Sequence, residues 1–300
     1  MSRMAQIATS GGNRGRRILI YGPPGVGKST LGADAPGAVV LPVEEGVDDL
    51  EVASFPRPQS WEEILEAVDV LAAGKTAHKT LVIDTVSAAE TLAHRRLIEG
   101  SKWNTVEKWE GGYNKWRQGV LDICWRPLLA RLDALRASTG MTVILLAHSQ
   151  VKAVRDPDSE GWDQHQIQME GLAAGLLTAW CDVVAFYAFD DIRVVEGKAR
   201  GVHTGRRVLR AEHSATAVAK NRVGLPELLE VPLAAPWSAL GRYLAPRDLA
   251  TELAELTAQL PSDAAERASR AAKTADKATM GRIISHARRL VAQQQEGASA

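Results

Sequence analysis

The chain has 300 residues, with 36 basic and 36 acidic side chains, so it carries no formal net charge at neutral pH. Hydrophobic residues make up 45% of it and charged residues 24%, which is ordinary for a globular protein and excludes a disordered or collagen-like chain. It has no long apolar run, no secretory signal and only two distant cysteines, which excludes a membrane helix and a disulfide framework and predicts a cytoplasmic protein.

Apolar, β-branched runs alternate with helical patterns along most of the chain. Strands are predicted at 17–21, 38–43, 80–83, 142–147 and 182–189, and shorter ones at 191–196, 205–212 and 215–219. Helices are predicted after residue 27 and at 60–73, 87–99, 117–138 and 168–179, and loops at 100–116 and 151–167. This order predicts an α/β fold with a mainly parallel central sheet and antiparallel edge strands.

Composition also predicts three regions. Residues 1–15 are expected to form a flexible basic arm, 16–245 the core, and 246–300 a helical C-terminal extension rich in alanine. The extension places apolar residues at helical spacings among arginines and lysines. It could pack on the core, bind DNA or recruit a partner, and the sequence leaves all three open.

The neutral total hides an uneven distribution of charge. Residues 41–70 contain nine acids and one base, whereas 193–222 contain eight bases and two acids. Segregation of this kind can create basic patches on a neutral protein, so zero net charge does not exclude a nucleic-acid partner. The alternative is a set of solvated faces that are mixed only in sequence.

The strongest motif follows the first predicted strand. It fits the pattern Gly-x-x-x-x-Gly-Lys-Ser, in which glycines let successive backbone N–H groups point at phosphates. We expect Lys28 to contact the β- and γ-phosphates of ATP, Ser29 to bind Mg²⁺ and Thr30 to reach the α-phosphate. The alternative is a chance glycine turn. The predicted nucleotide-binding residues are Gly22, Pro23, Pro24, Gly25, Val26, Gly27, Lys28, Ser29 and Thr30.

Carboxylates that could complete this site follow two other predicted strands. Asp84 ends the apolar run 80–83, at the sheet edge where a nucleotide would bind, so it is the predicted second Mg²⁺ ligand. Glu44 and Glu45 follow the second strand, and either could orient the attacking water. The alternative for the glutamates is an exposed acidic turn.

These motifs, in this order, resemble the core of the RecA-type recombinases over residues 16–232. The segments that resemble it are Glu44-Glu45-Gly46, the run from Ile83 to Ala89, Leu145 to Lys152, and Ala219 to Pro226. The most similar group is the minimal, phage-encoded one, whose members act in single-strand annealing and recombination. The resemblance implies a RecA-like P-loop ATPase that uses ATP and Mg²⁺, binds single-stranded DNA and forms a homo-oligomer, either a filament or a ring.

The resemblance also implies roles for residues outside the P-loop. Gln150 matches the glutamine that senses the γ-phosphate, and Lys220 and Arg222 match the basic residues that reach the neighbouring protomer's nucleotide. A phage origin would place the protein in a bacterial host cell, where the extension could recruit a single-strand-binding protein. His148 is interpreted as a structural histidine.

Two segments match the loops that hold DNA in this architecture. The segment 100–117 interleaves cations with aromatic rings, the combination that sequence-tolerant single-strand binding uses. Some of its rings could instead anchor the following helix in the core. The predicted DNA-binding residues are Lys102, Trp103, Lys108, Trp109, Tyr113 and Lys115 in this segment, and Lys152 and Arg155 in the second.

Three other functions stay open at this point. A hexameric helicase-like or loader motor would use the same fold, although such motors usually carry a further N-terminal domain. A small-molecule phosphotransferase would need an arginine-rich lid, and the segments 145–152 and 219–226 argue against it. A nucleotide-gated annealing scaffold would bind ATP without turnover.

Overall fold

The structure, a computed structural model, divides into two compact units, one spanning Arg14–Leu244 and the other containing the residues after Leu244. The expected basic arm lies outside the described residues except at Gly15, as do the tip of the expected loop 151–167 and parts of the extension. The structure describes residues 15–74, 76–155, 161–190, 192–196, 198–202, 204–244, 249–273, 275, 279–280, 282–284, 286–287 and 289–291.

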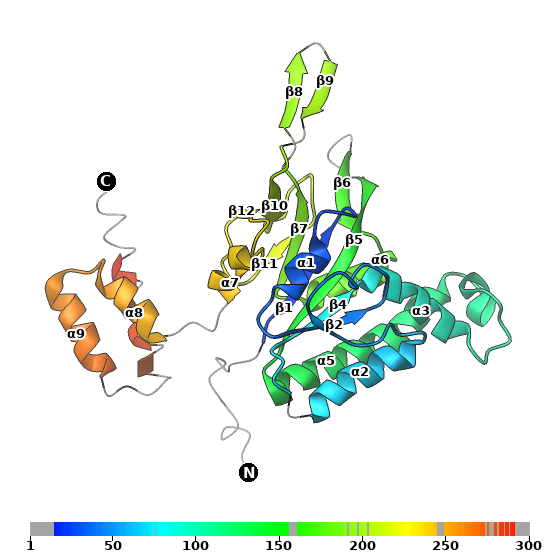
Figure 1. Ribbon diagram of the computed structural model, residues 1–300, viewed down its shortest axis with the longest axis horizontal. Coiled ribbons are helices and arrows are strands. Elements are labelled where there is room, and N and C mark those ends of the chain that lie inside the picture. Colours follow the sequence, from blue (N-terminus) through cyan, green and yellow to red (C-terminus); the bar gives the residue numbers. More distant parts are fainter. Residues whose placement is uncertain are drawn as a thin grey trace. The chain divides into compact units, whose positions relative to one another are not determined.

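A mixed sheet of ten strands forms the centre of the first unit (Figure 1). Its order is β12-β10-β7-β1-β5-β4-β2-β3, with β11 paired to β7 and β6 to β5. The strands from β3 to β7 in this order are mutually parallel, and β6, β10, β11 and β12 pair antiparallel. The strands are β1 (Arg17–Gly22), β2 (Ala38–Pro42), β3 (Ala53–Ser54), β4 (Thr80–Asp84), β5 (Thr142–Val154), β6 (Trp162–Ile167), β7 (Val183–Phe189), β10 (Arg207–Arg210), β11 (Lys220–Asn221) and β12 (Leu228–Val231); β8 (Ile192–Glu196) and β9 (Lys198–Val202) form a separate hairpin.

Helices cover both faces of this sheet (Figure 1). Along β1, Leu19 and Tyr21 pack into the core beneath α2, α3, α5 and α6, whereas Ile18 and Ile20 pack into the core beneath α1 and α7. Successive side chains of a strand point to opposite faces, so a strand buried on both faces reads as one continuous apolar run. The helices are α1 (Lys28–Ala33), α2 (Trp61–Ala73), α3 (Val86–Ile98), α4 (Lys115–Val120), α5 (Arg126–Thr139), α6 (Gly171–Trp180) and α7 (Ser238–Leu244).

The expected α/β class, with a mainly parallel sheet, antiparallel edge strands and C-terminal helices, is confirmed. The start of α2 follows its sequence signal, because the Ser60 hydroxyl accepts a hydrogen bond from the Glu63 backbone N–H at 3.2 Å. The Glu63 carboxylate in turn accepts one from the N–H of Gln59 at 2.8 Å.

Two local predictions were wrong and a third needs refinement. The expected loop 151–167 is largely a hairpin, because β5 continues to Val154 and pairs antiparallel with β6; most side chains of β6 are polar, including the buried Gln164, so the segment gave no apolar signal. The expected strand 215–219 contributes one isolated bridge, since the chain turns back at Ser214. The helix expected at 117–138 is present over Lys115–Thr139, and it contains a π-helical turn at Leu121–Trp125, just before Pro127, which lacks the N–H that a regular helix needs.

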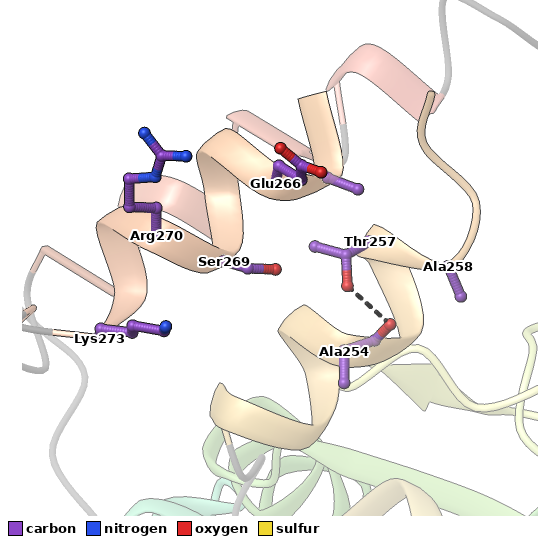
Figure 2. A pocket seen from close by; sticks show the side chains of 8 residues that line it. Ala254, Thr257, Ala258, Glu266, Ser269, Arg270 and Lys273 are labelled. Carbon is purple, nitrogen blue, oxygen red and sulfur yellow. Dashed lines mark hydrogen bonds between the residues drawn. The ribbon is translucent and has the colours of Figure 1, made fainter. Parts of the chain in front are cut away.

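The second unit is helical in its described residues. It contains α8 (Leu249–Thr257) and α9 (Ser262–Ala272), and further helical residues between 279 and 291, among which Ile284 and Val291 are buried. A pocket of about 510 Å³ lies along α8 and α9, and Thr257 and Ser269 point into it (Figure 2). Among the described residues of the whole chain, none of the helices combines the length and apolarity that a membrane span requires.

Candidate nucleotide-binding site

The P-loop joins the end of β1 to the start of α1. Its backbone needs glycine at both ends: a Cβ on Gly22 would lie 2.0 Å from the carbonyl oxygen of Tyr187, and Gly27 has a φ of +97°. Gly25, between them, has a φ of +75°. These left-handed conformations strain other residue types, so the loop geometry accounts for the glycines of the sequence pattern.

Lys28, the first residue of α1, lies inside this loop. Its ammonium group donates hydrogen bonds to the backbone carbonyls of Gly22 at 3.0 Å and Pro23 at 2.9 Å, and the residue is only 6% exposed. Burial lowers the pKa of Lys28, while the charges of Asp84 and Glu44 raise it. An ammonium that is held by neutral carbonyls in a buried place is a strong potential partner for phosphate.

Asp84 ends β4 and lies at the same edge of the sheet, where it is 2% exposed. Burial raises its pKa, and a hydrogen bond with the Ser29 hydroxyl lowers it. A hydroxyl beside a buried carboxylate suits Mg²⁺, which takes oxygen ligands and keeps several from water and phosphate. Among the described residues, no three His, Cys, Asp or Glu side chains are arranged so that they alone could hold a metal ion.

The structure separates the two candidate glutamates. The Glu44 carboxylate faces the site and lies 2.9 and 3.0 Å from Nε2 of His148, on β5. Glu45 points outward, its side chain is 87% exposed, and it pairs with Arg57 at 3.3 Å. Burial alone would raise the pKa of Glu44, but the His148 hydrogen bond and the charges of His148 and Lys28 hold it below its usual value. Glu44 is therefore a carboxylate at neutral pH.

His148 is a residue whose place the sequence did not indicate. It was interpreted as structural, and its partner Glu44 is 104 positions away in the chain. Its backbone N–H donates to the Ser87 hydroxyl at 2.9 Å, which ties β5 to the start of α3. Only the His-Ser-Gln order at the end of the strand's apolar run hinted that His148 stands at the site.

Gln150 lies two residues farther along β5. Its amide donates to the backbone carbonyl of Ile167 on β6 at 2.8 Å, so it ties the two strands of the hairpin together. It also lines a pocket of about 330 Å³ together with Glu44 and His148. The structure therefore brings the expected γ-phosphate sensor and Glu44 to one cavity.

Lys220 and Arg222 lie at the end of the sheet opposite the P-loop, where the parallel strands begin. β11 pairs with the first residues of β7, whereas the P-loop follows the last residue of the parallel strand β1. Lys220 donates to the backbone carbonyls of Thr178 and Ala179 at 2.8 and 2.7 Å, and Arg222 is exposed. Burial is the main cause that lowers the pKa of Lys220. Neither side chain contacts the P-loop of its own chain.

The aromatic segment 100–117 divides into exposed and packed rings. Trp109 packs on α4, since a Cβ on Gly119 would lie 2.7 Å from its ring, and Trp116 contacts His94 edge-on at 5.2 Å. Trp103 is partly exposed with Lys102 Nζ 4.8 Å from its ring centre, and Tyr113 is 95% exposed.

The predicted DNA-binding cations are all exposed. Lys115 donates to the backbone carbonyl of Glu110 at 3.0 Å, and Lys108 lies on a 3-10 turn at Val106–Gly111. Lys152 lies on β5, and Arg155 follows it. The structure thus leaves these four cations, as well as Lys102, on the surface.

The sheet, the P-loop and the Ser29–Asp84 pair define a P-loop domain of the nucleoside-triphosphatase class. Residues 14–223 match the model of the AAA domain family AAA_24, so the chain belongs to that family. The expected P-loop nucleotide-binding core is therefore confirmed at this level, and its DNA-related role stays a proposal.

Individual similarities are weaker. The chain is 23% identical over 142 residues to the SPβ prophage-derived uncharacterized protein YorG of Bacillus subtilis (strain 168), a match that covers 46% of this chain and 42% of the relative. The chain thus matches less than half of that protein's length. Among solved structures, the RadB recombinase is 13% identical with a TM-score of 0.41, covering 74% of this chain and 89% of its own; the flagellar accessory protein FlaH of Methanocaldococcus jannaschii is 10% identical with a TM-score of 0.39, covering 77% and 91%.

Proposed function

We propose that this protein hydrolyses ATP with Mg²⁺, binds single-stranded DNA and acts in annealing or recombination as a homo-oligomer. The observation that carries the proposal is the continuity of β5. This strand places His148 and Gln150 beside Glu44 and then continues past its parallel neighbours as a hairpin with β6, on which Lys152 is exposed. A change at the phosphate end of β5 can therefore be passed to the hairpin.

Charge and aromatic exposure support DNA as the partner of these surfaces. Lys152 and Arg155 are exposed on and just after β5, Trp103 offers a partly exposed ring beside Lys102, and Tyr113 is exposed in the same segment. Cations that follow a phosphate backbone and rings that stack on bases are the means of binding single strands without sequence preference. The prophage origin of the relative YorG agrees with a phage-encoded protein.

The opposite edge of the sheet supports an oligomer. Arg222 is exposed there, beside Lys220, and both are remote from the P-loop of their own chain. A head-to-tail interface that brings this edge to a neighbour's P-loop would give these cations a phosphate to bind, in a ring or in an open filament.

Single-stranded DNA should increase the rate of ATP hydrolysis. We expect the double variant Lys152→Ala/Arg155→Ala to lose most of this stimulation and to bind oligo(dT) more weakly. Its dependence of log affinity on log salt should be less steep by roughly 0.7 for each phosphate that the variant no longer binds. Steady-state ATPase assays and fluorescence anisotropy over a salt series measure both effects.

The matched control removes two arginines of α5, the exposed Arg126 and the half-buried Arg131, as Arg126→Ala/Arg131→Ala, and should behave as the wild type. An unchanged salt slope in the hairpin variant would contradict the DNA surface. Absence of stimulation in the wild-type protein would contradict the coupling and leave a DNA-independent ATPase.

Arg222→Ala tests the role of the opposite edge. We expect ATP affinity close to that of the wild type and turnover lower by about 10- to 100-fold, the worth of one charge-assisted hydrogen bond in the transition state. Mixing this variant with Lys28→Ala protein should restore part of the activity, because each Lys28→Ala protomer still offers Arg222 to its neighbour. Turnover that does not rise on mixing would argue against action between protomers.

A further inference from the structure

Arg207 is a cation beside the P-loop that the sequence analysis did not assign to it. It is the first residue of β10 and pairs with Phe189, the last residue of β7, at the end of the sheet that carries the P-loop. A Cβ on Gly27 would lie only 2.7 Å from Arg207 Nη1. The guanidinium group therefore reaches over the loop, 5.8 Å from the centre of the Phe189 ring.

Two buried polar groups at this place lack hydrogen-bond partners among the described residues. Within the part of the chain that the structure describes, buried Nε of Arg207 has no hydrogen bond of good geometry. The same holds for the hydroxyl of the fully buried Tyr187, although Arg207 is close enough to lower its pKa while burial raises it. Buried donors without acceptors are costly, so an anion at this place would stabilise both side chains.

The order of the strands gives the side from which Arg207 approaches. β7 and β10 lie on one side of β1, whereas β5 and β4, which carry His148 and Asp84, lie on the other. The Ser29–Asp84 pair and Glu44 thus mark the end of the site where the metal and the bond to be broken belong. Arg207 approaches the loop from the opposite side, near the phosphates that ATP and ADP share.

We propose that Arg207 binds the nucleotide's α- or β-phosphate in its own protomer and thereby sets the affinity for both ATP and ADP. This inference rests on the proposed nucleotide-binding function. It gives Arg207 a role different from that of Arg222, which lies at the opposite edge and acts on turnover.

Calorimetric titration of the full-length protein with Mg·ATP and with Mg·ADP tests the inference. Arg207→Ala should lower the affinities for ATP and ADP by a similar factor of about 10 to 100, the value of one charge-assisted hydrogen bond. The matched control is Arg206→Ala, which removes the adjacent arginine; Arg206 is 53% exposed and pairs with Asp190. This control should bind both nucleotides within about twofold of the wild type, a change of under 0.5 kcal/mol.

Arg207→Lys keeps the charge and should recover part of the lost affinity, which separates phosphate binding from a general loss of structure. Wild-type affinities in Arg207→Ala, or a loss confined to ATP, would overturn the inference while the proposed function stands. A wild-type protein that binds neither nucleotide would overturn both.

Discussion

Lys28→Ala is expected to abolish ATP turnover and to weaken ATP binding by at least about 100-fold, the upper range for one charge-assisted hydrogen bond. The reason is the environment of the ammonium group, which is almost fully buried and donates hydrogen bonds to the carbonyls of Gly22 and Pro23. A phosphate would exchange these neutral acceptors for an anion. Titration with a fluorescent ATP analogue and an ATPase assay measure the two effects.

The control for this variant is Lys79→Ala, which removes an exposed lysine just before β4, at the far edge of the sheet. Its ATP affinity and turnover should match those of the wild type. Thermal unfolding without nucleotide shows whether Lys28→Ala still folds, and only the wild type and the control should gain stability when ATP is added. Turnover near the wild-type rate in Lys28→Ala would refute the P-loop assignment.

The phosphate-binding part of the site was predictable because it is local. The glycine pattern, the strand before it and Lys28 lie within a few residues, and their geometry follows from backbone rules that the sequence shows directly. The role of Asp84 was equally predictable, since a residue that ends an apolar parallel strand comes to the end of the sheet where ligands bind. The five central strands were predictable for the same reason, because burial on both faces leaves a continuous apolar run.

What could not be predicted depends on contacts between distant segments. The partner of Glu44 is His148 on β5, and no local pattern joins them. The positions of Arg222 and Arg207 follow from antiparallel strands that pair with opposite ends of β7. The basic run 193–222 gives no indication of which of its residues pair with which end. The hairpin of β5 and β6 was mistaken for a loop because most side chains of β6 are polar, even at the buried position of Gln164, so its alternation was not visible as hydrophobicity.

The two neighbouring glutamates should differ sharply in a substitution test. We expect Glu44→Gln to lower ATP turnover by about 10²- to 10⁴-fold, the contribution of a positioned acid or base, while ATP binding is retained. Glu45→Gln should leave turnover near the wild-type value, because it removes only an exposed ion pair with Arg57, whose worth is about 0–1 kcal/mol. From the sequence, either glutamate could be catalytic, whereas in the structure their burial and their partners differ.

Glu44→Gln is also informative about the fold, because the amide can still hydrogen-bond to His148 and keeps the volume of the carboxylate. Single-turnover hydrolysis and binding of a fluorescent ATP analogue together distinguish a defect in chemistry from a defect in binding. Equal losses in both variants would contradict the assignment of Glu44. Normal turnover in both would mean that neither carboxylate activates water, and that the low pKa of Glu44 reflects only its pairing with His148 and the Lys28 charge.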